Sequence, residues 1–268
     1  MPSVTVVKRG SHIPASSLRS GRMTERSMDR YYDLVSEQMR QVRDTQWRKI
    51  DQAAQWLGEA LANDRWLYAF GTGHSHALAE EIFYRAGNPA RATPMLDSRL
   101  MLHENAIEAT YNEREHGYGI KLLHSYPVER GDLLIVASNS GRNAVPIDVA
   151  LEGRKLGMKV VAITNLAHTR AWPSRHSGGK NLAEVAELTI DNCGVSGDAC
   201  LELEGLPGKI GPTSTCTGAL IVNAIIVQGL EYALRRGKAP EIYISSNSNG
   251  DDHNDLLLQK YRSKIRHL

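Results

Sequence analysis

Cysteine is scarce in this sequence: three are present among 268 residues, at positions 193, 200 and 216. So few and such scattered thiols exclude a disulfide framework and a paired CxxC metal site. The first residues lack the charged-then-apolar pattern of a secretory signal, and no apolar run approaches the roughly 20 residues that span a bilayer. These absences predict a cytoplasmic protein that does not associate with membranes.

An excess of positive charge is also lacking outside the first residues. The formal net charge is +2, from 32 Lys and Arg against 30 Asp and Glu. Residues 1–30 contain six of the basic residues and two of the acids, so the rest of the chain carries a net charge of −2. Without a basic field, the sequence predicts no nucleic-acid partner.

The chain divides by composition into three parts. Residues 1–26 are rich in Ser, Gly and Arg and predict a disordered or tag-like extension. Residues 27–240 form the predicted domain, which begins with a long amphipathic helix over 27–63 that lies on the main domain or on a partner subunit. Residues 241–268 are polar, then helical and basic, and we expect this tail near the site or a dimer interface.

Apolar segments alternate with helical ones inside the predicted domain. The strand candidates are 66–70, 91–96, 132–138, 159–164 and 188–192. A helix is predicted over 76–87 after the first strand, and a long apolar helix over 213–236. Buried strands that alternate with helices predict a mostly parallel sheet covered on both faces. The predicted fold is therefore α/β: a three-layer αβα sandwich around a five-stranded sheet, with an N-terminal helix and a C-terminal tail.

Three loops of similar composition follow predicted strands or open a helix. They are GTGHS at 71–75, SNSG at 138–141 and GPTST at 211–215. Ligands of parallel sheets collect at the carboxyl ends of the strands, and hydroxyl and N–H donors beside helix N-termini suit an anion. One such loop is more often an ordinary turn, but three at matching positions favour a shared anion site.

Two nucleotide motifs and a zinc motif are absent. His76 stands where a dinucleotide fingerprint needs its third glycine, and no Gly-Lys-Ser/Thr sequence is present. Ile107 replaces the second histidine of a zinc HExxH, and His74 and His76 are two residues apart and do not share a helix face. We therefore expect a phosphate monoester held by neutral donors, with no metal and no cofactor.

The first two loops resemble those of the sugar isomerase (SIS) domain, whose members bind phosphosugars through a GxGxS loop and an SxSG loop. The resemblance covers roughly residues 35–240 and implies a flavodoxin-like SIS fold. It assigns Ser75, Ser138 and Ser140 to the phosphate, while Asn143 stands where the family often has Thr. Together with the donors of all three loops, the predicted phosphate-binding residues are Gly73, His74, Ser75, Ser138, Asn139, Ser140, Asn143, Thr213, Ser214 and Thr215.

The resemblance also suggests catalytic residues. The segment AEEI resembles AEEL of the phosphoheptose isomerases, which points to Glu81. The acid-rich segment 100–117 is comparable to one that carries a catalytic Glu in the N-acetylmuramic acid 6-phosphate etherases, so Glu104 and Glu113 are candidates, although acids in such a segment are often only solvated. His253 in the tail is a further candidate, since several SIS domains use a late histidine, from their own chain or from a neighbour.

These residues together predict an enzyme that acts on a phosphorylated amino sugar, such as N-acetylglucosamine 6-phosphate. Abstraction of the C2 proton is common to isomerisation and to elimination at C3. The third loop resembles the helix opening of the etherases, which favours elimination by a lyase or dehydratase. The alternatives are an aldose–ketose isomerase and a non-catalytic phosphosugar sensor. The long first helix and the habit of the family predict a homodimer.

Overall fold

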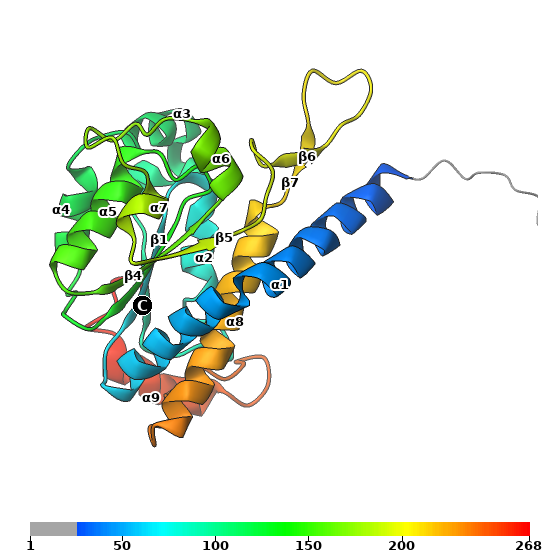
Figure 1. Cartoon of the computed structure of the whole chain (residues 1–268). Helices are drawn as coiled ribbons and strands as arrows, with labels where there is room; N and C mark the ends of the chain where they lie inside the picture. The colour runs from blue at the N-terminus through cyan, green and yellow to red at the C-terminus, as the bar shows by residue number, and fades with distance from the viewer. Residues whose placement is uncertain (1–25) are drawn as a thin grey trace, which may run out of the picture.

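The computed structural model describes residues 26–268, so the predicted extension lies outside it except for Arg26. A five-stranded sheet forms the middle layer, with helices on both faces (Figure 1). The strand order is β2-β1-β3-β4-β5, and every neighbouring pair is parallel. This flavodoxin-like order confirms the predicted three-layer α/β fold.

The described elements follow the predicted alternation of strands and helices. The strands of the sheet are β1 (Leu67–Gly71), β2 (Ala92–Met95), β3 (Leu133–Ala137), β4 (Lys159–Thr164) and β5 (Leu188–Asp191). The helices are α1 (Ser27–Ala62), α2 (His76–Glu81), α3 (Leu102–Asn112), α4 (Tyr118–His124), α5 (Ala144–Lys155), α6 (Leu166–Ala171), α7 (Leu182–Val185), α8 (Ser214–Arg235) and α9 (Asp251–Tyr261), and the 3-10 turns are η1 (Gly73–Ser75) and η2 (Ser98–Leu100).

The two faces of the sheet bury separate apolar cores because side chains alternate along a strand. Leu67 and Ala69 of β1 pack with α1, α2 and α8, whereas Tyr68 and Phe70 pack with α4, α5 and α7. All five residues of β1 and of β3 are buried, as strands covered on both sides must be. The loops at the carboxyl ends of these strands are therefore supported from both layers.

Helices α1 and α8 run side by side over most of their length, and the first half of α1 projects beyond the sheet (Figure 1). Gly58 and Gly229 allow this close approach, since a Cβ at Gly58 would lie 2.5 Å from the Tyr232 Cβ. Helix α8 has the length and the mean hydropathy, 1.4, of a membrane-spanning helix. Its buried face packs in the core of the α1 layer, where a soluble domain also places such a helix.

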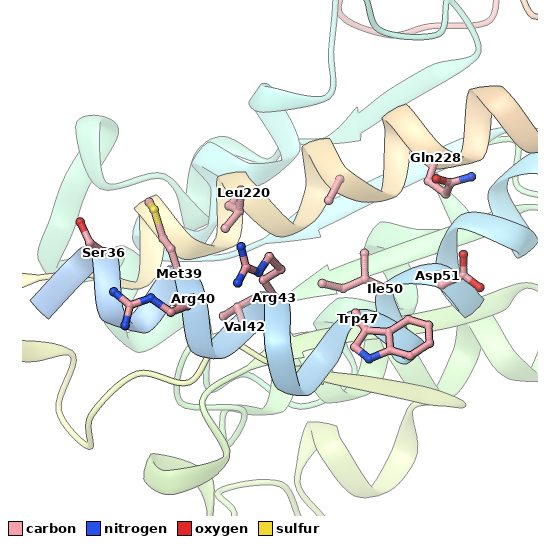
Figure 2. Close-up of a pocket in the computed structure, with 11 residues that line it drawn as sticks. Ser36, Met39, Arg40, Val42, Arg43, Trp47, Ile50, Asp51, Leu220 and Gln228 are labelled. Atoms are coloured by element: carbon pink, nitrogen blue, oxygen red, sulfur yellow. The ribbon is translucent and has the colours of Figure 1, made fainter. Parts of the chain in front are cut away.

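A groove of about 640 Å³ lies between α1 and α8, away from the carboxyl ends of the strands (Figure 2). Its apolar lining includes Met39, Trp47, Ile50 and Leu220, and Trp47 is 54% exposed. Exposed apolar side chains of this size are typical of an interaction surface. The helix predicted over residues 27–63 thus has one apolar side that is buried in the core and another that is exposed in the groove.

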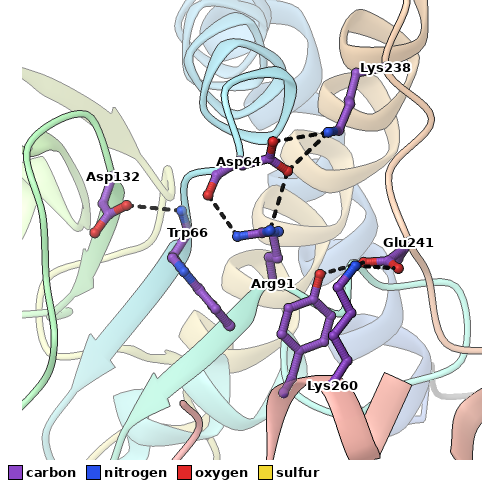
Figure 3. Close-up of polar contacts among 8 residues, drawn as sticks. Asp64, Trp66, Arg91, Asp132, Lys238, Glu241 and Lys260 are labelled. Atoms are coloured by element: carbon purple, nitrogen blue, oxygen red, sulfur yellow. Dashed lines mark hydrogen bonds and ion pairs between the residues drawn. The ribbon is translucent and has the colours of Figure 1, made fainter. Parts of the chain in front are cut away.

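The C-terminal tail lies at the amino ends of β1 and β2, opposite to the loops. Tyr261 and Leu257 of α9 pack with Ala90 and Trp66, which precede these strands. Backbone hydrogen bonds join the tail to the domain, from the Ala90 N–H to the Glu241 carbonyl at 2.8 Å and from the Tyr243 N–H to the Asn88 carbonyl at 3.0 Å. Ion pairs brace each side of this contact: Arg91 and Lys238 both bind Asp64 within the domain, and Lys260 binds Glu241 at 2.8 Å within the tail (Figure 3). The tail therefore stabilises the base of the domain within its own chain.

Three elements differ from the sequence-based expectation. Helix α2 ends at Glu81, although the pattern predicted a helix to residue 87, because Tyr84 adopts a positive φ of 44° that no helix tolerates. The acid-rich segment 100–117, which has the composition of a loop, contains helix α3, and helix α4 follows it directly. The antiparallel hairpin of β6 (Ala199–Leu201) and β7 (Ile210–Pro212) was not predicted, since its strands have only three residues each.

Candidate functional site

The first two hydroxyl-rich loops meet at the point where the strand order reverses. Strands β1 and β3 are neighbours, with Gly71 opposite Ala137, and their chains continue to opposite sides of the sheet. In open parallel sheets this switch point forms a crevice that receives ligands. The predicted meeting of GTGHS and SNSG at one edge thus follows directly from the strand order.

A small polar pocket joins all three predicted loops. Seven of its lining residues come from these loops or from directly beside them, and Asn192 comes from the end of β5. The lining residues are His74, Ser75, Leu78, Ala137, Ser138, Asn139, Ile163, Asn192, Ser214 and Thr215. The third loop, far away in the sequence, therefore lies beside the first two.

Several hydroxyl groups in this region have no partner among the described residues. The side chains of Ser75, Ser140 and Thr215 make no hydrogen bond there, and the Ser138 Oγ only accepts one from the Gly141 N–H at 3.1 Å. Each hydroxyl keeps its proton available for an acceptor. Such a set of neutral donors at a strand edge suits an anionic oxygen.

The second loop needs glycine at position 141. Gly141 has a φ of 63°, and a Cβ there would lie 2.8 Å from the Thr164 hydroxyl. Thr169 closes the turn from the other side by donating to the Ser140 carbonyl at 3.1 Å. The backbone of the loop is thus fixed by β4 and α6 and does not depend on a ligand for its shape.

The start of α8 is already capped by a carboxylate. Asp198 accepts hydrogen bonds from the backbone N–H groups of Thr213 and Ser214 at 3.0 and 2.9 Å, and from the Ser214 hydroxyl at 2.7 Å. These are the donors that the sequence assigned to a phosphate, so Thr213 and Ser214 serve the helix cap. Thr215 keeps a free hydroxyl at the pocket.

Asn192 is a pocket residue that sequence reasoning missed. Its side-chain amide donates to the Asn139 Oδ1 at 2.8 Å. Its backbone carbonyl accepts from the side chain of Gln38 on α1 at 2.8 Å. A residue at the end of β5 therefore fixes the side chain of Asn139, and Gln38 connects helix α1 to the same residue. An asparagine at the end of a strand gave no motif signal, although Asn192 was the last residue of the predicted strand 188–192.

Glu113 binds directly to two of the loops. Its carboxylate accepts from the Thr72 hydroxyl at 2.7 Å and from the Asn143 amide at 2.6 Å. Burial raises the pKa of Glu113, against the opposing effects of the Thr72 hydrogen bond and of Arg114 and Arg175 nearby. A mostly buried carboxyl with a raised pKa at a strand edge is suited to proton transfer.

Asn143 does not line the pocket. Both the nitrogen and the oxygen of its side-chain amide form hydrogen bonds to other side chains. Its nitrogen donates to Glu113, and its oxygen accepts from Arg175 at 3.0 Å. The side chain is buried at the start of α5. In this arrangement Asn143 positions Glu113, which differs from its predicted contact with phosphate.

Glu81 lies between α2 and α8 and does not line the pocket. Its carboxylate accepts from the Asn223 amide at 2.7 Å and pairs with Arg85 at 3.0 Å. Asn223 is eight residues beyond Thr215, which places it about 12 Å further along α8. The carboxylate therefore faces a helix contact below the loops.

Glu104 and His253 also lie apart from the pocket. Glu104 is exposed on α3 beside His103, at 3.8 Å. The His253 ring on α9 contacts the Ile242 carbonyl at 2.9 Å, at the edge of the sheet opposite to the loops. The structure does not bring His253 to the site of its own chain, and a role in a neighbouring copy stays a prediction.

A zinc site at His74 or His76 would need further ligands, and the candidates His116 and His168 have separate partners. The His116 ring accepts from the Ser177 N–H at 2.8 Å, and the His168 ring accepts from the Gly197 N–H at 3.1 Å. Over residues 26–268, no three His, Cys, Asp or Glu side chains are grouped as a metal site requires. His74 lines the pocket, where its ring is a further polar group.

Comparison with known sequences gives a consistent family. A family model described as SIS domain matches residues 30–165. A UPF0309 protein of Halalkalibacterium halodurans is 39% identical over 236 residues, which cover 88% of this chain and 94% of the relative. A UPF0309 protein of Caldanaerobacter subterraneus is 38% identical over 245 residues, which cover 90% of this chain and all of the relative.

Solved structures with a similar arrangement are more distant in sequence. A phosphoheptose isomerase from Francisella tularensis is 18% identical, with a TM-score of 0.49, over 75% of this chain and 95% of its own. The Vibrio vulnificus NanR protein, complexed with ManNAc-6P, is 15% identical, with a TM-score of 0.49, over 88% of this chain and 70% of its own.

Proposed function

The chain belongs to the family of SIS-domain proteins, and on this premise we propose that it is an enzyme that binds a sugar phosphate at the three loops and moves a proton with Glu113. The observation that carries the proposal is the contact of a part-buried carboxyl with Thr72, three residues before Ser75 in the first loop, and with Asn143, directly beyond the second loop. Binding donors and an acid–base group thus meet at one strand edge.

The neutral donors decide how the phosphate is held. Ser75 and Thr215 line the pocket, Ser140 lies in the second loop beside it, and none of their three hydroxyls has a partner among the described residues. Hydrogen bonds to a charged oxygen are roughly twice as strong as those between neutral groups. A phosphate monoester therefore gains from each free hydroxyl without the need for a lysine.

Glu113 is the acid–base group of the proposal. Its ionised form removes the proton from the carbon beside the carbonyl of the open-chain sugar, and the electron pair moves to the carbonyl oxygen. Return of the proton to C1 gives an isomer, whereas departure of the C3 substituent gives an elimination product. The raised pKa lets the same carboxyl hold the proton between these steps.

The substrate follows from the group at C2. An N-acyl group there leaves no hydroxyl that can become a ketone, so elimination is the outcome expected for an N-acetylated amino sugar. The likeness of the third loop to the etherases favours this outcome, and an aldose–ketose isomerase is the alternative. Glu81 remains a candidate for the second acid–base group if ligand binding changes its contact with Asn223.

We also propose that two copies meet through the groove between α1 and α8. Its charged lining residues already have partners within the chain, since Arg40 pairs with Glu37, Arg43 with Asp44, and Asp51 accepts from the Tyr232 hydroxyl. The apolar lining that Figure 2 shows, with Trp47 and Ile50 on α1 and Leu220 on α8, is what two identical helix pairs would cover around a twofold axis. Val227 on α8 is 71% exposed, and contact with a second copy would remove this apolar side chain from water.

The test is incubation in D2O with sugar phosphates, followed by NMR. The substrates are N-acetylglucosamine 6-phosphate, glucosamine 6-phosphate, N-acetylmuramic acid 6-phosphate and sedoheptulose 7-phosphate. We expect deuterium at C1 or C2 or a new olefinic signal with at least one of them. Binding without any exchange would contradict catalysis and support a sensing role instead.

A further inference from the structure

Three arginines surround Glu113 on the side of the sheet that bears α5. Arg114 follows Glu113 directly, Arg142 follows Gly141 of the second loop, and Arg175 lies in the segment between α6 and α7. The Arg175 side chain donates to the Asn143 Oδ1 at 3.0 Å, and Asn143 in turn holds Glu113. The cluster is therefore connected to the site by hydrogen bonds.

The segment 172–181 holds these arginines in place. The Arg175 N–H donates to the Arg142 carbonyl at 2.8 Å, and the Arg142 Nε donates to the Pro173 carbonyl at 3.0 Å. His176 pairs with the buried Asp148 of α5 at 3.0 Å. A sequence of this composition suggests a mobile surface loop, but these bonds tie it across the second loop.

The cluster has more positive charge than the described chain neutralises. No carboxylate oxygen among residues 26–268 lies within 4.0 Å of the guanidinium of Arg114, Arg142 or Arg175, whereas half of the other arginines in this range form such pairs. The Arg114 Nε is buried without any hydrogen-bond partner. A buried donor without a partner is costly, and three adjacent cations repel one another.

Neighbouring groups support this picture. Burial lowers the pKa of Arg175 first, and the charges of Arg114 and Arg142 lower it further. Aromatic rings hold two of the guanidiniums, since Arg114 lies 5.5 Å from the Tyr111 ring and Arg142 lies 5.8 Å from the Trp172 ring. The cations are thus placed in advance, and an anion is the group that they lack.

The hydroxyl pocket and the arginine cluster lie on opposite sides of the second loop. The pocket contacts Leu78, Ala137 and Ile163, which belong to the core under α1, α2 and α8. The cluster adjoins Asn143 at the start of α5, which packs on the other face of the sheet. A ligand that crosses the edge at residues 138–141 meets both.

We propose that this arginine cluster is a second anion subsite, so that the ligand is a sugar phosphate with an additional anionic group, a carboxylate or a second phosphate. The proposal rests on the proposed function, because it assumes that the hydroxyl loops hold the first phosphate. Glu113, bonded to Thr72 of the first loop and to Asn143, then lies on the side of the ligand that faces the arginines.

The experiment is calorimetric titration of the full chain with three ligands: glucose 6-phosphate, 6-phosphogluconate and fructose 1,6-bisphosphate. We expect at least one of the two doubly anionic ligands to bind at least about tenfold more tightly than glucose 6-phosphate. The affinities of 6-phosphogluconate and fructose 1,6-bisphosphate, compared with each other, show whether the cluster prefers a carboxylate or a phosphate as the second anion. Equal affinity for all three ligands would overturn the subsite.

The double variant Arg142→Gln with Arg175→Gln should remove this preference and leave the affinity for glucose 6-phosphate within about twofold. Arg262→Gln, directly after α9 at the far edge of the sheet, is the matched control for loss of charge. An equal weakening of all ligands would assign the cluster to the first phosphate and overturn the subsite. Absence of any binding to wild-type protein would instead refute the proposed function. If the Gln double variant does not fold, the double variant Arg142→Lys with Arg175→Lys, which keeps both charges, is measured in its place.

Discussion

Replacement of Glu113 by Gln is the perturbation that most sharply tests the proton-transfer role. The side chain is mostly buried and accepts from both Thr72 and Asn143, at 2.7 and 2.6 Å. A Gln carbonyl can keep the bond from Asn143, and its NH2 can donate to the Thr72 oxygen after the hydroxyl rotates. We therefore expect the free energy of unfolding to change by less than about 1 kcal/mol at neutral pH.

Activity should fall much further than stability. General acid–base catalysis contributes about 10²- to 10⁴-fold, so the rate of deuterium incorporation from D2O should fall by that factor in Glu113→Gln. Phosphosugar affinity should change little, because the pocket hydroxyls are untouched. The assay is NMR of exchange at C1 or C2, alongside calorimetric binding to the same protein.

Two further variants make the result interpretable. Glu115→Gln removes the same charge two residues away, from an exposed side chain that pairs with Arg99 at 2.9 Å, and should keep its activity. Glu113→Ala should lower the free energy of unfolding by about 1–3 kcal/mol, since the buried Asn143 amide loses its acceptor. Full activity in Glu113→Gln would refute the reasoning.

Three other predictions follow from burial, from the groove and from the helix cap. The raised pKa of Glu113 means that its contribution to stability is fully present below the ordinary Glu pKa and is lost as the pH rises through the folded value. In urea titrations, wild type should therefore lose stability relative to Glu113→Gln above about pH 4, and a constant difference would contradict the shift. Val227→Asp should halve the mass seen by light scattering at unchanged fold, and an unchanged mass would place the dimer contact elsewhere. Asp198→Ala should cost about 0.5–2 kcal/mol in thermal unfolding, and no loss would mean that α8 needs no cap.

Strands and loops could be predicted because their signals are local. The predicted strands of five to seven residues ended within one residue of the observed strands, and glycine and serine marked the turns after β1 and β3. Since parallel strands share one carboxyl edge, the meeting of the first two loops followed from the chain alternation. The third loop came to the same place by the packing of α8 on α1.

The carboxylates could be assigned from the sequence less well, because their roles depend on long-range contacts. Glu81 and Glu113 have similar local settings, but 41 residues separate Glu113 from Thr72 and 142 separate Glu81 from Asn223. Asp198 emerged as the cap of α8 only because the β6–β7 hairpin brings it there. Side-chain partners across such distances leave no periodic signal in one sequence.

The most direct measurement of the central claim is phosphate recognition by the hydroxyl-rich loops. Titration of the wild-type chain should give binding of N-acetylglucosamine 6-phosphate and none of N-acetylglucosamine at the same concentration. The double variant Ser75→Ala with Ser140→Ala should weaken the phosphorylated ligand by about tenfold or more without a change in the melting temperature. Equal binding of both sugars, or full affinity in the double variant, would contradict the account.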